Sequence, residues 1–545
     1  MDKKNFIIGI ICLFAAFSLF VRQEKQLRQQ APQQPVAVVQ NESPTPQPEP
    51  ALVLPQQDLT TSQIYTLENE AVKVHFTTHG GAIHSIELKR YPAELKGEQA
   101  YIFNQTSKIP ALGLAWDKNH LILNNFVLSA QTNDFIQFSC TLNDGTQIIR
   151  GYRLANSNDE NPYRIQNEFL IQQPEFKHES VWVHLGTMPD TPGDKYLEYL
   201  NFCTFDGKTA DFKRIADFEA SNGFLGMGKK AASNYLEANA NFTWCALKNQ
   251  FFAAIFTPKT SINGYLTFPR KGTSANESHL IEGLIKFDLN SAQSKVTAEY
   301  YVGPKDFLLL NKMGQEQDQL MQFGFFGAVS KILLMAMKAI YSVIPNWGWT
   351  IIVLTFIIKL LMWPITQAQL RSSKKMASIQ APLQQIREKY KNNPQKLQME
   401  TMKLFKENRV NPAAGCLPIF LQIPIFIGLY YMLRTSSEIR FQSFLWIQDL
   451  SIPDTVASLG SFPINILPLI MGVTMFIQMR ITPTPSVDNM QQKIIMWMPF
   501  IFLIFCYNFP AALVLYWTVQ NIFTILQQWL TNRKKELDQP APKHS

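Results

Sequence analysis

Acidic and imidazole side chains are absent from the five long apolar stretches that fill most of the C-terminal third of this chain. All eight histidines lie elsewhere, seven of them from His75 to His279 and the last at His544. Proton relays, carboxylate ion sites and intramembrane metalloprotease or Ser-His chemistry therefore lack their side chains in these stretches. No GxxxxGK[ST] phosphate loop occurs, which excludes nucleotide hydrolysis by that route. We expect no catalytic residues, no cofactor and no enzymatic activity.

Cysteine is scarce and scattered, with six residues and no CxxC motif or Cys/His cluster. An odd number of them lies in the part of the chain between the first and second apolar stretches: Cys140, Cys203 and Cys245. Neither a disulfide framework nor a metal site is expected. His75, His79 and His84 are close in sequence, but they fall in a predicted strand and turn, so a metal site there is the weaker interpretation.

Charged residues are also few, at 17% against 46% hydrophobic residues, and the second half of the chain is too apolar for a soluble protein. We therefore expect an α-helical polytopic membrane protein. Six segments have the length and composition of transmembrane helices: Phe6–Val21, Trp347–Thr366, Gly415–Leu433, Phe462–Met479, Ile494–Phe509 and Ala511–Leu530.

Positive charges mark one side of the membrane. Lys3 and Lys4 precede the first span, the loop 371–411 holds ten Lys/Arg and three Glu, and 533–535 is basic. The positive-inside rule places both termini and these loops in the cytoplasm and exports residues 22–344. We expect the first span to be an uncleaved anchor, because no small-x-small cleavage site follows Phe20.

The exported part has three regions. Its first residues are rich in Pro and Gln, which favours an extended tether. Alternating apolar runs such as 72–76 and 296–302 then predict a large all-β sandwich. In the third region, Lys331 and Lys338 lie seven residues apart on one face of an apolar helix, which predicts an interfacial helix rather than a seventh span.

After the second span, apolar residues recur at spacings of three and four on both sides of Asn393-Pro394 and predict a helical hairpin. Its other faces are basic and include Lys374, Lys375, Lys389, Lys391, Lys403 and Arg409. These residues are either a solvated face or a docking surface for RNA or acidic proteins.

These observations divide the chain into consecutive regions. They are an N-terminal anchor (1–22), a Pro/Gln-rich linker (23–57), a β-sandwich domain (58–320), an interfacial amphipathic helix (321–345), a core of five transmembrane helices (346–532) with the cytoplasmic hairpin (371–411), and a basic tail (533–545).

Lys359 is the only charged side chain inside the five apolar stretches. A lysine at the bilayer centre costs about 2.5–3.5 kcal/mol, so such residues line a watery cavity, find a partner or extend to the headgroups. Neutral polar residues that could converge on it are Thr355, Gln422, Thr474, Gln478, Thr518, Gln520 and Asn521. They indicate either a hydrated cavity or ordinary interhelical hydrogen bonds, and nearby Trp363 and Pro364 leave extension to the headgroups open.

Several motifs in the right order give the chain a family resemblance. They are Arg409–Pro418, Gln422–Phe426, Leu429–Leu433, Leu467–Phe476, Met490–Lys493 with Met498-Pro499, and Leu513–Tyr516 with Asn521. In these segments, and from end to end, the chain resembles the YidC-type family of bacterial membrane-protein insertases.

The resemblance implies that the five C-terminal spans enclose a hydrophilic groove, open to the cytoplasm and to lipid and closed outwards. Lys359 aligns with the groove cation of the family, which is usually Arg; a lysine keeps the charge but not the planar fork. Tyr516 and Trp517 stand where the family often has Tyr-Tyr, and both Lys359 and Trp517 are positions linked to contact with the incoming chain. The apolar faces of the third and fifth spans are expected to guide the substrate helix.

The resemblance also implies the setting. The chain is expected in the inner membrane of a Gram-negative bacterium, with its β domain a periplasmic supersandwich. Implied partners are nascent inner-membrane proteins as substrates, the Sec translocon, the ribosome and targeting machinery through the cytoplasmic loops, and anionic phospholipids, but not DNA. Two other functions remain open from the residues: a small-anion transporter or channel that uses Lys359, and an assembly chaperone without insertion activity.

Overall fold

The computed structural model describes residues 62–105, 107, 109–156, 159–191, 194, 197–220, 230–271, 279–408, 410, 417–460, 462–481 and 489–537. The predicted anchor 1–22 and linker 23–57, as well as Arg409, lie outside the described residues. The chain divides after Met321 into two compact units, a β-rich one and a helical one.

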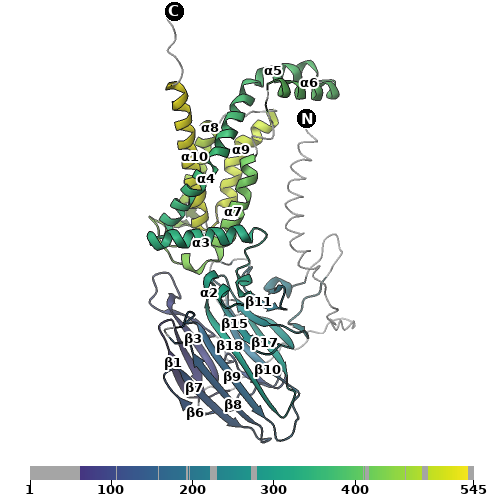
Figure 1. Cartoon of the computed structure of the whole chain (residues 1–545), viewed down its shortest axis with the longest axis vertical. Helices are drawn as coiled ribbons and strands as arrows, with labels where there is room; N and C mark the ends of the chain where they lie inside the picture. The colour runs from purple at the N-terminus through teal and green to yellow at the C-terminus, as the bar shows by residue number, and fades with distance from the viewer. Residues whose placement is uncertain are drawn as a thin grey trace, which may run out of the picture. The chain divides into compact units, whose positions relative to one another are not determined.

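A nine-stranded antiparallel sheet forms the largest part of the β-rich unit (Figure 1). In spatial order its strands are β12 (Ala210–Arg214), β11 (Asn201–Phe205), β14 (Trp244–Lys248), β15 (Phe252–Pro258), β18 (Gln293–Pro304), β9 (Arg164–Gln172), β8 (Gln147–Leu154), β7 (Phe135–Thr141) and β6 (Val127–Gln131).

Two smaller sheets complete this unit. One contains β13 (Leu236–Ala238), β16 (Gly264–Lys271), β17 (His279–Asp288), β10 (Ser180–Pro189) and β5 (Leu114–Ala115); the other contains β1 (Ile64–Glu68), β2 (Val72–Thr77), β3 (Ala82–Pro92) and β4 (Ala100–Phe103). Short helical turns η2 (Ile215–Asp217), α2 (Phe307–Lys312) and η3 (Gln317–Met321) lie outside the sheets.

One row of side chains explains how the sheets pack. Phe138, Arg150 and Phe169 are directly opposite one another on β7, β8 and β9, so they share a face. Phe138 contacts Phe76 of the four-stranded sheet, and Phe169 contacts Phe287 of the five-stranded sheet. The nine-stranded sheet therefore carries both smaller sheets on the same face.

Buried Arg150 lies between the two smaller sheets and donates to the carbonyl oxygens of Gly80 and Leu112. Both terminal guanidinium nitrogens are thus bonded to backbone acceptors, which lowers the cost of burying the charge, while Nε has no hydrogen-bond partner among the described residues. The predicted β-rich domain is confirmed.

In the described residues, the helical unit contains eight α-helices and a small β-hairpin. They are α3 (Gly327–Val343), α4 (Trp347–Ser378), α5 (Gln380–Lys389), α6 (Pro394–Glu407), α7 (Leu417–Thr435), α8 (Ile466–Ile481), α9 (Asn489–Cys506) and α10 (Ala511–Leu537), with η5 (Ser437–Ile439), β19 (Thr455–Leu459) and β20 (Phe462–Asn465) between α7 and α8.

Several boundaries differ from those predicted. The predicted fourth span, Phe462–Met479, begins in β20, because Phe462–Asn465 pair with β19 and helix α8 starts only at Ile466. The predicted interfacial helix 321–345 begins at Gly327, because Gly324 adopts a positive φ of 67° before it.

Two further boundaries differ. The second span and the first arm of the predicted hairpin form one helix, α4, which contains Pro364 and runs to Ser378 before the separate α5. At the C-terminus, α10 passes through the predicted end of the core at 532 and continues to Leu537.

By length and apolar composition, α4 is the one helix in the described part of the chain that can cross a membrane; α8 and the Trp497–Cys506 part of α9 are shorter apolar helices. The predicted span Phe6–Val21 lies outside the described residues.

Helix α3 lies across the long axes of α4 and α7 (Figure 1). It approaches α7 closely because Gly428 has no side chain: a Cβ there would lie 3.2 Å from Val329 Cγ1, and Ser330 Oγ donates to the Gly428 carbonyl oxygen at 3.0 Å. Lys338 on the same helix forms an ion pair with Glu438 at 2.8 Å. Lys338, one of the two lysines of the predicted interfacial helix, is thus neutralised by Glu438, which follows α7.

The β-rich unit buries a lysine that forms no ion pair with any described carboxylate. Lys305 is fully buried, and its Nζ has no hydrogen-bond partner in the described part of the chain. Burial and the nearby Lys248 hold the pKa of Lys305 well below its usual range. Between the folded and unfolded pKa values the unfolded chain binds more protons, so the cost of this residue to stability grows as the pH falls from about 10.

We expect Lys305→Met to raise the melting temperature of the β-rich unit, and to raise it more at pH 7 than at pH 10. Each kcal/mol gained corresponds to about 2–4 °C for a domain of about this size. Thermal unfolding of the full chain, followed by circular dichroism at both pH values, measures the difference. The control is Lys295→Met, which removes an exposed lysine paired with Glu168 at 2.8 Å; equal pH dependence in both variants would contradict the prediction.

Candidate functional site

Lys359 lies in α4 with 6% of its surface exposed. Its Nζ donates to Thr524 Oγ1 on α10 at 2.8 Å. Among the described residues, no carboxylate is paired with this ammonium group. An ammonium carries three N–H donors. One is used by Thr524, so the group keeps the capacity to donate to a further acceptor.

Thr524 is suited to this contact because its own proton is already used. Its hydroxyl donates to the Gln520 carbonyl oxygen, one turn earlier in α10, at 2.7 Å. The oxygen therefore faces Lys359 as an acceptor. A neutral hydroxyl bonds the cation without neutralising it, and the positive charge remains available to a partner.

A second polar contact joins the same two helices further along. Gln367 Nε2 of α4 donates to Thr531 Oγ1 of α10 at 2.9 Å. Between the two contacts lies Gln527, with 1% of its surface exposed and neither amide atom hydrogen bonded. We call these five residues, Lys359, Gln367, Thr524, Gln527 and Thr531, the polar seam. An unbonded buried amide group costs about 1–3 kcal/mol, so the Gln527 amide keeps the capacity to donate and accept further hydrogen bonds.

The residues predicted from sequence form other contacts. Gln422 of α7 bonds the Tyr516 hydroxyl of α10, and Asn521 Nδ2 of α10 donates to Thr474 Oγ1 of α8 at 3.2 Å. These pairs tie α10 to α7 and to α8. Gln478 and Gln520 are half-buried on α8 and α10.

Two predicted threonines satisfy themselves within their own helices. Thr355 donates to the Ile351 carbonyl oxygen at 2.6 Å, and Thr518 donates to that of Val514 at 2.8 Å. None of the predicted residues is bonded to Lys359. Its partner Thr524 was missed, although it follows Gln520 and Asn521 by four and three residues and so extends their helix face.

Trp517 is an aromatic contact between helices. Its ring lies 4.9 Å from that of Phe426 on α7 and 4.5 Å from that of Phe502 on α9, measured between centroids. The side chain thus helps to hold α7, α9 and α10 together at this level.

The loop between α7 and α8 ties the helix starts together at one end of the unit. The Leu467 N–H at the start of α8 donates to Asp454 Oδ2 at 2.6 Å, and the Ala511 N–H at the start of α10 donates to the Ile452 carbonyl oxygen at 2.9 Å. Phe444 packs on Gly348 near the start of α4, where a built Cβ would lie 2.0 Å from the Phe444 ring. This loop therefore caps three helices at once.

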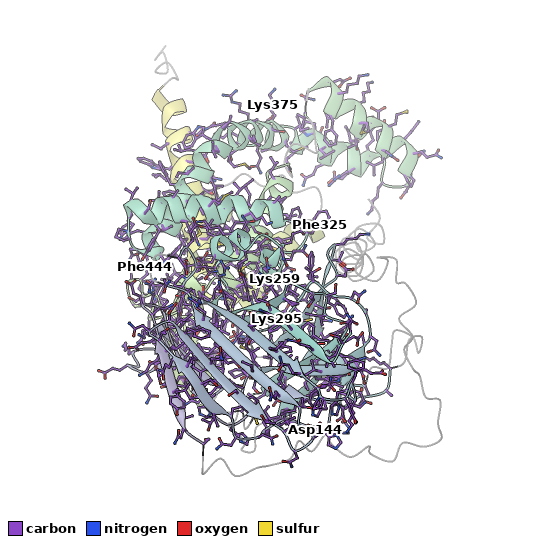
Figure 2. The ribbon with its side chains drawn as sticks, turned by 60° about the horizontal axis from the view of Figure 1, so that its bottom comes forward. Asp144, Lys259, Lys295, Phe325, Lys375 and Phe444 are labelled. Carbon is purple, nitrogen blue, oxygen red and sulfur yellow. The ribbon has the colours of Figure 1, made fainter. Side chains whose placement is uncertain are left out.

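The predicted docking residues lie around α5 and α6. Met376, Ile379 and Val410 are buried together against Leu404 and Phe405, which leaves the basic side chains outside this small core. Lys375, shown in Figure 2, and Lys389, Lys391 and Lys403 are exposed, and Lys374 is half-buried.

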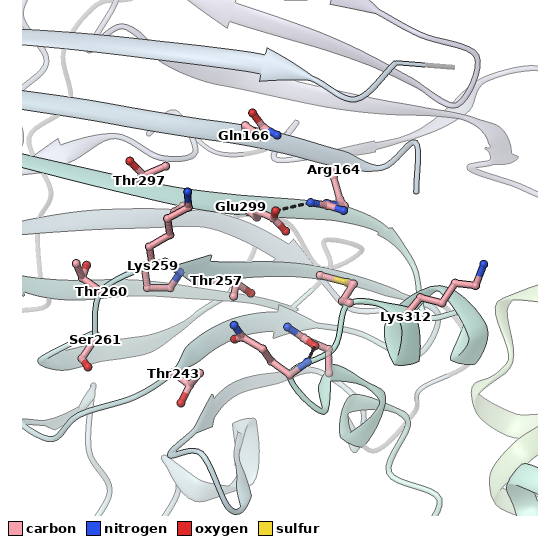
Figure 3. A pocket seen from close by; sticks show the side chains of 15 residues that line it. Arg164, Gln166, Thr243, Thr257, Lys259, Thr260, Ser261, Thr297, Glu299 and Lys312 are labelled. Atoms are coloured by element: carbon pink, nitrogen blue, oxygen red, sulfur yellow. Dashed lines mark hydrogen bonds and ion pairs between the residues drawn. The ribbon is translucent and has the colours of Figure 1, made fainter. Parts of the chain in front are cut away.

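The β-rich unit has a separate polar pocket of about 590 Å³ (Figure 3). Arg164 and Glu299 are paired in it, Lys312 is paired with Glu160 at 3.0 Å, and the buried Thr257 hydroxyl has no hydrogen-bond partner. No residue of this pocket was predicted. In the described part of the chain, no group of three His, Cys, Asp or Glu side chains could hold a metal ion.

The fold and the seam define a class: a helical membrane protein with a large β-rich domain and a buried cation that no described acid neutralises. Two family profiles match, "60Kd inner membrane protein" over residues 339–539 and "YidC periplasmic domain" over residues 64–336. The chain belongs to the YidC family of membrane-protein insertases.

Individual relatives agree. The chain is 31% identical to membrane protein insertase YidC of Cupriavidus necator over 87% of this chain and 83% of the relative, and 29% identical to that of Actinobacillus succinogenes over 98% of each. A crystal structure described as an active YidC insertase covers 88% of this chain and 95% of its own, at 18% identity and a TM-score of 0.36. The family resemblance and the expectation of a non-enzymatic protein are confirmed.

We expect Thr524→Val to destabilise the helical unit by about 1.5–3 kcal/mol, the range for a hydrogen bond to a charged group, because the variant removes the acceptor of Lys359. Unfolding in mixed micelles measures the change. Thr518→Val is the matched control, since Thr518 is equally buried and bonds only within its own helix. An equal loss in the two variants would show that the Lys359 contact contributes nothing.

Proposed function

We propose that this chain inserts nascent inner-membrane proteins by admitting the short exported tail of a substrate to a hydrophilic groove beside Lys359. The proposed architecture is an N-terminal anchor and five transmembrane helices, α4 and α7–α10, with both termini in the cytoplasm and a periplasmic β-supersandwich. The single observation that supports it most is the buried Lys359 ammonium, which has a neutral hydroxyl as its bonded partner and N–H groups to spare.

The energies of charge burial and charge attraction favour a substrate tail that carries an acidic residue. A carboxylate at the bilayer centre costs about 2.5–3.5 kcal/mol. A cation ~6 Å away returns about 3 kcal/mol at an effective dielectric constant near 20. The cost of burying the carboxylate and its attraction to the cation nearly cancel, so the tail can enter the groove and leave it without being bound tightly. The membrane potential then draws it outwards with about 2.3 kcal/mol per charge per 100 mV.

The contacts around the seam support the proposed shape of the groove. Gln422, Tyr516, Thr474 and Asn521 place polar atoms between α10 and its neighbours α7 and α8. The α7–α8 loop caps the helices at the end assigned to the periplasm, which supports a groove closed on that side. Exposed apolar side chains on α7 and α9, such as Ile423 and Ile504, suit a path along which a substrate helix slides into lipid.

The exposed lysines of α4–α6 support a cytoplasmic docking role. We assign Lys374, Lys375, Lys389, Lys391, Lys403 and Arg409 to contact with the ribosome, the targeting machinery or anionic phospholipids, because a dense positive surface attracts polyanions. Cooperation with the Sec translocon is part of the same proposal. The names of the relatives favour an insertase over a small-anion transporter.

The charge argument predicts an ordered series at position 359. In proteoliposomes with an acidic-tailed, single-span substrate, Lys359→Arg should retain insertion, Lys359→Ala should lose up to about 100-fold, and Lys359→Glu should abolish it, since about 3 kcal/mol equals about two factors of ten. A protease-protected tail is the readout.

The controls separate charge from folding. A substrate whose tail acid is replaced by Gln should depend far less on residue 359, and Lys295→Ala in the β-rich unit should insert like the parent. Equal insertion by the Arg, Ala and Glu variants would exclude the charge mechanism, and no protected tail with the parent would exclude insertion itself.

A further inference from the structure

The α7–α8 loop ends in a β-hairpin whose apolar side chains point into the surroundings. Every residue of β19 is exposed, and the exposed fractions are 47% for Val456, 72% for Leu459 and 59% for Phe462. No charged side chain occurs from Thr455 to Met479. A two-stranded hairpin is marginal on its own in water, so a rigid, uncharged, apolar hairpin needs an apolar neighbour.

The hairpin is attached to the helices through its second strand, β20. Asn465 Nδ2 donates to the Tyr507 carbonyl oxygen at 2.7 Å, and the Tyr507 hydroxyl donates to the Pro463 carbonyl oxygen at 2.7 Å. The rings of Phe462 and Tyr507 stack with centroids 5.4 Å apart. Tyr507 lies between α9 and α10, so β20 is fixed along its length to these two helices, while β19 is exposed. Gly460, with a φ of 61°, makes the tight turn between the two strands.

The helix that follows is too short for a bilayer. Helix α8 has 16 residues, which span about 24 Å at ~1.5 Å per residue against a hydrocarbon core of about 30 Å. The hairpin leads directly into α8, and its four β20 residues add about 13 Å at ~3.3 Å per residue. Leu469 and Val473 on α8 are exposed apolar side chains as well.

We propose that β19 and β20 insert into the outer leaflet of the membrane as an anchor, with lipid acyl chains around Val456, Leu459 and Phe462. The inward-facing backbone groups of the hairpin are bonded across its two strands. Its outward-facing backbone groups need water or headgroups, so the hairpin lies shallow, at the boundary between the headgroups and the acyl chains. Exposed Trp446, whose Nε1 donates to Asp454 at 3.1 Å, lies in the same loop and suits the headgroup level. The hairpin thereby extends the apolar surface of the short helix α8 to the headgroup boundary.

The inference rests on the proposed placement of α8 across the bilayer, and the test separates the two. An environment-sensitive NBD fluorophore is attached to a single cysteine, Leu459→Cys, Val473→Cys or Lys177→Cys, in the full chain with its native cysteines replaced, reconstituted in phosphatidylcholine liposomes. Quenching by doxyl-labelled lipids and by aqueous iodide is compared at the three sites. Val473 reports the middle of α8, and Lys177 is an exposed residue of the β-rich unit.

We expect the Leu459 label to be quenched several-fold more by doxyl lipids than by iodide, and most strongly by a shallow 5-doxyl chain. Lipid quenching at Val473 with iodide quenching at Leu459 equal to that at Lys177 would overturn the anchor alone. Water exposure at both Leu459 and Val473 would overturn the placement of α8 as well. Protection of Leu459 from both quenchers would assign the hairpin to a protein contact instead of lipid.

A second measurement needs no cysteine replacement. Leu459→Asn combined with Phe462→Asn should lower the melting temperature in bilayers of long acyl chains and change it little in short-chain bilayers, where α8 alone matches the thickness. The control is Leu308→Asn, an exposed leucine of the β-rich unit. Equal shifts in long-chain and short-chain bilayers would overturn the anchor.

Discussion

The helical unit is organised around one ammonium group that is withdrawn from water and bonded to a hydroxyl rather than to an acid. A carboxylate at Thr524 would neutralise Lys359 and remove its attraction for other anions, while an apolar residue there would leave the cation without its bond. A threonine whose proton is used by its own helix gives an intermediate solution: it holds the side chain in place and leaves the charge unneutralised. The other polar contacts of α10, to α7 and α8, keep that helix in the register that this bond requires.

The loop between α7 and α8 also fixes the positions of the helices, because its backbone and aromatic contacts hold the starts of α4, α8 and α10. Backbone and aromatic contacts thus fix one end of these helices, while side-chain hydrogen bonds of the polar seam join α4 to α10. The β-rich unit has its own core, built on the row of Phe138, Arg150 and Phe169, and no residue of the seam belongs to that unit.

Composition and periodicity predicted a good part of this arrangement. Apolar length located the starts of α4, α7, α8, α9 and α10 to within five residues, because a bilayer imposes a minimum run, but it missed the ends of α4 and α10, which continue as polar helix. Alternation located the β-rich domain. The sequence pattern failed where tertiary contacts decide. Phe462–Asn465 read as the start of a helix, yet their pairing with β19 and the bonds of Asn465 to Tyr507 make them a strand. The partner of Lys359 was missed because one threonine among several polar residues on α10 can be selected only by its distance from α4.

The close packing of α3 on α7 has a mechanical consequence. Gly428 and Ser330 bring the two helices into backbone contact, and Lys338 and Glu438 add a charged link beyond the end of α7. Because α3 is joined at two separate points, to α7 and to Glu438 beyond its end, the two helices move together. A tilt of α7 must therefore carry α3 with it, so that any force acting on α3 is passed directly to α7 and to the helices that α7 contacts.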